Sequence, residues 1–155
     1  MKSTFTSLEI AQLTGITLRQ LQWWDEQDIV AASRSGHRRI YSLNDLAEIA
    51  IICELRGRGF SLQKVRSITQ FLQKQFGPRL VEAVRSAEES YLLTDGSNIY
   101  VVNSARGVVD LLKSSRQPML SVCLSDIVRR VCGDPPQARK RVASVRHSTG
   151  SSKAS

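Results

Sequence analysis

Two groups of polar and basic side chains lie close together near the start of the chain. The first comprises Arg19, Gln20, Gln22 and Trp23, and the second is the run Gly36-His37-Arg38-Arg39-Ile40-Tyr41. Arginine forms paired hydrogen bonds with guanine or phosphate, and glutamine forms them with adenine. These residue types therefore suit contacts with base edges and phosphates, provided that the fold presents both groups on one surface.

The residues around the first group predict two short helices. Thr6 lies three residues before Glu9, and Thr17 lies three before Gln20, so each pair can form a capping box. Gly15, between them, favours the positive φ that ends a helix. We predict a helix over residues 7–13 and a second helix from Leu18. The apolar spacing predicts inward-facing side chains in both helices, namely Leu18, Leu21 and Trp24 packed onto Leu8, Ala11 and Ile16.

A β-hairpin is expected to present the basic run. Residues 29–32 and 39–41 have the composition of its two arms, and residues 33–37 form a polar tip. Ser42 then starts a helix with an inward stripe of Leu46, Ile49, Ala50 and Cys53. Glycines 57 and 59 end that helix, and Ser61 caps a further helix over residues 62–75. The arrangement is that of a winged helix-turn-helix, whose second helix can enter a DNA major groove.

Several landmarks along this segment recur in the order and spacing of one known family. They are Phe5-Thr6, Ile10-Ala11, Leu13-Thr14-Gly15-Ile16-Thr17, Leu21-Gln22-Trp23-Trp24-Asp25, Gly36-His37-Arg38-Arg39-Ile40-Tyr41-Ser42, Asp45-Leu46 and Arg58-Gly59-Phe60-Ser61-Leu62. On these landmarks, residues 5–68 resemble the DNA-binding domain of the MerR family of transcriptional regulators. Two departures are visible, because Trp23-Trp24 replaces the usual Tyr-Tyr or Tyr-Trp, and Gln22 replaces a common arginine.

The resemblance implies a sequence-specific regulator that binds double-stranded DNA. Its expected form is a homodimer on an inverted-repeat promoter site, where it distorts the DNA between two promoter elements, with RNA polymerase as a further partner. A protein that distorts DNA recognises sequence partly through the energy of that deformation.

Individual roles follow for the residues of the expected DNA contact set. Arg19 and Gln20 would reach base edges, Trp23 would pack on sugars, and Arg38 would hold phosphate from the wing. Tyr41 would either add a hydroxyl contact or be buried beneath the wing. A helix N-terminus favours anions, so the amides after Ser61 would contact the flanking backbone. The complete expected set is Thr17, Arg19, Gln20, Gln22, Trp23, Arg34, His37, Arg38, Arg39, Tyr41, Arg58 and Ser61.

Charge and composition agree with a nucleic-acid partner. The chain has 155 residues and a formal net charge of +8, and 16 of its 22 basic residues are arginine. Phosphate is a natural counterion for such a surface. We find neither a signal-peptide pattern nor an apolar run near the roughly 18–20 residues of a membrane span, so we expect a cytoplasmic protein at the nucleoid.

The second half of the chain predicts a small α+β unit. A short helix is expected over residues 79–87, followed by a hairpin of residues 91–94 and 99–102 around an Asp-Gly turn. A helix capped by Ser104, a strand at residues 120–124 and a last helix to Val131 complete a β-β-α-β-α order. The fold class is mainly α with small β. The expected division is 1–76 for DNA binding, 77–132 for dimerisation or effector binding, and 133–155 for a disordered basic tail.

Two other classes of protein are alternatives to a transcriptional regulator. An excisionase-like architectural or adaptor protein would use a similar winged helix, and would bind direct repeats as a monomer or act mainly through another protein. An enzyme would need Cys123 or Cys132 beside a histidine, and no spacing places them together. Cys53 lies on an apolar stripe. We expect buried thiols, no metal site and no cofactor.

Overall fold

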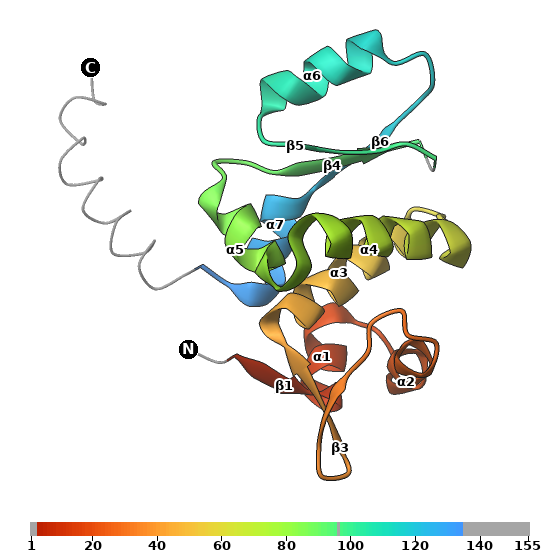
Figure 1. Cartoon of the computed structure of the whole chain (residues 1–155), viewed down its shortest axis with the longest axis vertical. Coiled ribbons are helices and arrows are strands. Elements are labelled where there is room, and N and C mark those ends of the chain that lie inside the picture. The colour runs from red at the N-terminus through yellow and green to blue at the C-terminus, as the bar shows by residue number, and fades with distance from the viewer. Residues whose placement is uncertain (1–2, 96, 135–155) are drawn as a thin grey trace, which may run out of the picture.

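The computed structural model describes residues 3–95 and 97–134. Figure 1 shows a helical centre with the first helices and the wing at one end, and a small sheet with one covering helix at the other. The expected class, mainly α with small β, is confirmed. The part of the expected tail that covers residues 135–155 lies outside the described residues.

The first helices begin and end where local sequence signals place them. Strand β1 (Thr4–Thr6) leads into α1 (Ser7–Thr14), and α2 (Leu18–Glu26) follows the turn. Both predicted capping boxes are present, at Thr6 with Glu9 and at Thr17 with Gln20. Gly15 has a φ of 83° and ends α1 in the left-handed conformation. The structure confirms these predictions. Each signal acts between residues that are close in sequence, so the sequence alone was enough to predict it.

The wing differs from its prediction in one strand. It consists of β2 (Ser33–Ser35) and β3 (Arg38–Ser42), and β1 adds to the other edge of β3 in the order β1-β3-β2. The predicted arm 29–32 is wrong, because Ile29 and Val30 are buried outside any strand. After α2 the chain turns at Asp28, with a φ of 56°, and directs these two side chains into the core. The expected tip, 33–37, therefore supplies β2.

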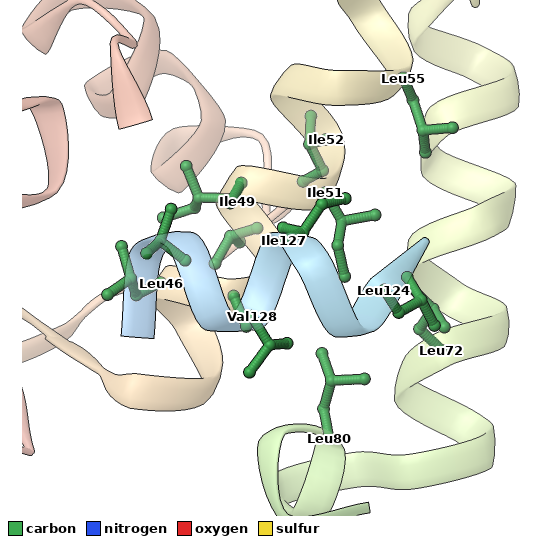
Figure 2. Packing of buried hydrophobic residues seen from close by; sticks show 14 of the residues in the cluster. Leu46, Ile49, Ile51, Ile52, Leu55, Leu72, Leu80, Leu124, Ile127 and Val128 are labelled. Atoms are coloured by element: carbon green, nitrogen blue, oxygen red, sulfur yellow. The ribbon is translucent and has the colours of Figure 1, made fainter. Parts of the chain in front are cut away.

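Helix α3 (Leu43–Gly57) is the centre of the molecule. Ser42 caps it with Asp45, and its buried apolar residues lie on more than one side. The reason is that α1, α4 (Leu62–Phe76), α5 (Leu80–Ser86) and α7 (Leu124–Cys132) all pack against it. Figure 2 shows α7 crossing α3, with Ile127 and Val128 among the α3 side chains.

The predicted β-β-α-β-α order is confirmed in the second half. A 3-10 turn, η1 (Gly77–Arg79), precedes α5. The order continues with β4 (Tyr91–Thr94), β5 (Ile99–Val102), α6 (Ala105–Ser114), β6 (Leu120–Cys123) and α7. The strands form an antiparallel sheet in the order β5-β4-β6. No helix in the described part of the chain is long and apolar enough to cross a bilayer.

Buried side chains from both halves of the chain are in contact with one another. One cluster of buried side chains runs from Phe5 in β1 to Val131 in α7. The element that joins the halves is α7, which packs more extensively on α3 than on the sheet that precedes it. The buried residues of α7 are Leu124, Ile127, Val128 and Val131. Helices α5 and α7 of the second half thus pack on α3 of the first half, and the division at residues 76 and 77 stays a prediction.

Helix α6 lies outside this core, over β4 and β5. None of its residues is buried, and Val109 and Leu112 are 48% and 44% exposed. Gly107 permits its close approach to the sheet, because a Cβ at this position would overlap Cγ1 of Val102.

Candidate DNA-binding interface

Helix α2 presents a polar face to solvent. Arg19, Gln20 and Gln22 are exposed, and Trp23 is 42% exposed, whereas Leu21 and Trp24 are buried. The face expected to contact DNA is therefore accessible.

The inward packing predicted for Leu18 and Leu8 is wrong. They are 50% and 56% exposed. The buried side of this short helix is centred on Leu21, Trp24 and Asp25, which leaves Leu18 at its margin. An apolar side chain at the start of α2 thus adds to the accessible face.

The glutamines of α2 are hydrogen-bonded within the helix. Gln20 Oε1 accepts from the backbone N–H of Thr17 at 3.4 Å, and Thr17 Oγ1 accepts from that of Gln20 at 3.1 Å. Gln22 Nε2 donates to Glu26 Oε1 at 3.0 Å. Arg19 forms no ion pair within residues 3–95 and 97–134. Arg19 is thus free to reach a ligand, whereas each glutamine must first leave its contact within the helix.

A buried carboxylate connects α2 to the wing. Asp25 is 8% exposed, and its Oδ1 accepts the backbone N–H of Ala32 at 2.8 Å. Its Oδ2 accepts Nη2 of Arg34 at 3.1 Å and Nε of Arg39 at 2.7 Å. Burial by itself would raise the pKa of this carboxyl. The hydrogen bonds from Arg39 and Ala32 and the nearby charge of Arg34 outweigh burial and hold the pKa below its usual value.

Asp25 was not among the residues that the sequence predicted for this interface. A signal was present, because an acidic residue follows the apolar pair Trp23-Trp24 and precedes a basic run. Its partners lie nine and fourteen residues along the chain. Only the fold therefore decides that all three side chains meet.

The basic residues of the wing fall into two groups. Arg34 and Arg39, whose side chains are 53% and 24% exposed, are paired with Asp25. His37 and Arg38 are exposed at the tip, and Arg38 forms no ion pair among the described residues. The tip therefore leaves Arg38 as the cation best placed to bind phosphate.

Tyr41 lies beneath the wing. Its side chain is fully buried, and burial raises the pKa of its hydroxyl. Of the two roles expected for it, the structure places Tyr41 in the packing role. We therefore leave it out of the proposed DNA contacts.

The α3–α4 connection contains the remaining expected contacts. Arg58 Nε lies 2.9 Å from Glu54 Oε2, and Ser61 Oγ accepts the backbone N–H of Lys64 at 3.3 Å. Glu54 partly neutralises Arg58, so a phosphate would compete with this carboxylate. Ser61 caps α4, as predicted.

Within residues 3–95 and 97–134, no three histidine, cysteine or acidic side chains are grouped so as to hold a metal ion. Cys53, Cys123 and Cys132 are free and partly buried. Burial raises the pKa of Cys53 and raises that of Cys132 to about 11, so these thiols are not activated nucleophiles.

Comparisons with known proteins match the segment that contains α2 and the wing. Residues 5–72 match the model of a family described as "MerR HTH family regulatory protein". The match covers less than half of the chain, so it is this segment that is similar to the MerR family. It is 31% identical over 127 residues to an "Uncharacterized HTH-type transcriptional regulator" of Mycobacterium tuberculosis, covering 79% of this chain and 53% of the relative.

Two further relatives are a transcriptional regulator and a nodulation protein. The HTH-type transcriptional regulator GlnR of Bacillus cereus is 27% identical over 82 residues, or 52% of this chain and 60% of GlnR. The nodulation protein NolA of Bradyrhizobium is 29% identical over 129 residues, or 74% of this chain and 54% of NolA. The chain spans about half the length of most of these curated relatives. The description of the matched family and the names of the mycobacterial relative and of GlnR are those of transcriptional regulators.

Proposed function

We propose that this protein is a sequence-specific transcriptional regulator that binds double-stranded DNA through α2 and the tip of its wing. The proposal rests on the exposed face of α2, where Arg19 has no ion pair among the described residues, and on the exposed Arg38 of the wing. Both lie in the segment that matches the MerR family model. Arg19 and Gln20 contact base edges at the start of the recognition helix, and Arg38 contacts phosphate.

The proposed active form is a homodimer on an inverted-repeat promoter site. Two copies place two recognition helices on successive major grooves, and the protein distorts the DNA between the half-sites. Exposed apolar side chains on β5 and α6 support self-association, namely Tyr100, Val109 and Leu112. The regulator acts at the nucleoid in the cytoplasm, with RNA polymerase as its partner at the promoter.

The test is selection of bound duplexes from a random pool with the purified full chain, followed by sedimentation of the complex. We expect an inverted repeat with fixed spacing and two protomers per site. Direct repeats occupied by single protomers would instead support the excisionase-like alternative. Failure to bind any duplex at low salt would refute DNA recognition, because phosphate contacts are strongest there.

A further inference from the structure

We propose that Asp25 is a positioning residue that determines DNA specificity by holding the wing at a set place beside α2. The inference rests on the proposed function, since it concerns how the same surface recognises DNA. Asp25 is buried, so its carboxylate acts through the residues that it orients.

The hydrogen bonds of Asp25 link three separate points of the wing to one helical residue. Ala32 directly precedes β2, Arg34 lies within β2, and Arg39 lies within β3. Both strands of the wing are therefore held by the last turn of the recognition helix. Because the contacts reach both strands, they restrict rotation of the hairpin as well as its distance from α2.

The pairing of the wing strands explains why this carboxylate is needed. Arg34 and Arg39 are direct partners in the β2–β3 ladder. Like charges opposite each other destabilise an antiparallel pair. Residues 29–44 contain no aspartate or glutamate, so the wing has no acid of its own to separate these guanidinium groups. Asp25 supplies the missing negative charge from the neighbouring helix.

Loss of the carboxylate has opposite consequences for the two kinds of DNA binding. Specific binding needs the wing tip and α2 to match the backbone and the groove together, so a displaced wing weakens it. Non-specific binding depends on the number of cations that reach phosphate. Arginines released from Asp25 become available to any duplex. The two affinities should therefore move apart, which simple destabilisation of the fold does not produce.

The test compares full-length Asp25→Asn with the unmodified chain on the selected site and on an unrelated duplex of equal length, over a range of salt concentrations. Glu26→Gln is the matched control. It removes the same formal charge from the next residue of α2, whose carboxylate is exposed and bonds only Gln22 among the described residues. Circular dichroism and thermal unfolding report the folded fraction of each variant.

We expect Asp25→Asn to lower the ratio of specific to non-specific affinity by about tenfold, which is the size of one misplaced base contact. Its non-specific salt dependence should steepen by about one unit for each arginine that gains a phosphate. Glu26→Gln should raise both affinities and leave their ratio unchanged. Parallel changes in Asp25→Asn, in either direction, would overturn the proposal.

A second variant keeps the test decisive if Asp25→Asn does not fold. Arg39→Gln removes one contact but leaves Asp25 bonded to Arg34 and Ala32. The specificity ratio should fall here too, and an unchanged ratio in a folded Arg39→Gln protein would overturn the role of Asp25. Absence of any duplex binding by the unmodified chain would instead refute the proposed function itself.

Discussion

The buried carboxyl of Glu48 leads to a quantitative prediction about stability. Glu48 lies on α3 and is 8% exposed. Burial raises the pKa of its carboxyl from 4.5 to about 7, and the nearby Asp45 adds to the rise, whereas a hydrogen bond with Gln73 opposes it. The unfolded chain ionises Glu48 near its ordinary pKa, while the folded protein keeps it protonated up to about pH 7.

The sign and size of the effect follow from this difference in pKa. Below about pH 4.5 the carboxyl is protonated in both states, so ionisation has no cost. Between pH 4.5 and about 7 the unfolded chain alone loses its proton, and the free energy of unfolding falls by about 1.4 kcal/mol per pH unit. The difference of about 2.5 units corresponds to a total loss on the order of 3 kcal/mol.

Substitution Glu48→Gln should remove this loss. Urea unfolding of the unmodified chain and the variant between pH 4.5 and 8 measures the effect as the difference between their free energies. We expect Glu48→Gln to gain about 2–3 kcal/mol over the unmodified protein as the pH rises from 4.5 to 8, with the change complete a little above pH 7. Glu82→Gln is the control, because Glu82 is exposed on α5. A difference that is independent of pH would refute the reasoning.

Three further substitutions separate contacts with DNA from packing. Arg38→Ala should weaken binding to all duplexes alike and reduce the salt slope by about one unit, and normal binding by this variant would refute the wing contact. Arg19→Ala should cost about 1–3 kcal/mol on the selected site and relax the base preference at one position, as measured by repeating the selection; an unchanged preference would argue against a base contact. Gly107→Ala should destabilise the protein by about 1–3 kcal/mol in urea, because its Cβ meets Val102. Since Gly107 is remote in sequence from α2 and the wing, monomeric affinity for DNA should persist, and unaltered stability would contradict the close packing of α6.

Local signals in the sequence predicted most of the helices and turns. The capping boxes at Thr6 and Thr17 and the positive φ at Gly15 depend on contacts within about four residues, so the tertiary fold changes them little. The hairpin of β4 and β5 was predicted at the observed bounds, because an Asp-Gly turn lies between two apolar runs. The resemblance of residues 5–68 to the MerR family rests on the same kind of signal, short landmarks at constant spacing, and the family model matches residues 5–72.

Contacts between distant parts of the chain decided the rest. Ile29 and Val30 have the composition of a strand, yet they fill the core because the turn at Asp28 directs them inward. Helix α7 packs more extensively on α3, which lies more than sixty residues earlier, than on the neighbouring strand β4, and no local signal in the sequence shows this. The sequence shows which residues are charged, but it does not show which of them form ion pairs with one another. The pairing of Arg34 and Arg39 with Asp25 depends on how the hairpin folds back onto α2. The same arrangement leaves Arg38 without an ion pair in the part of the chain that the structure describes.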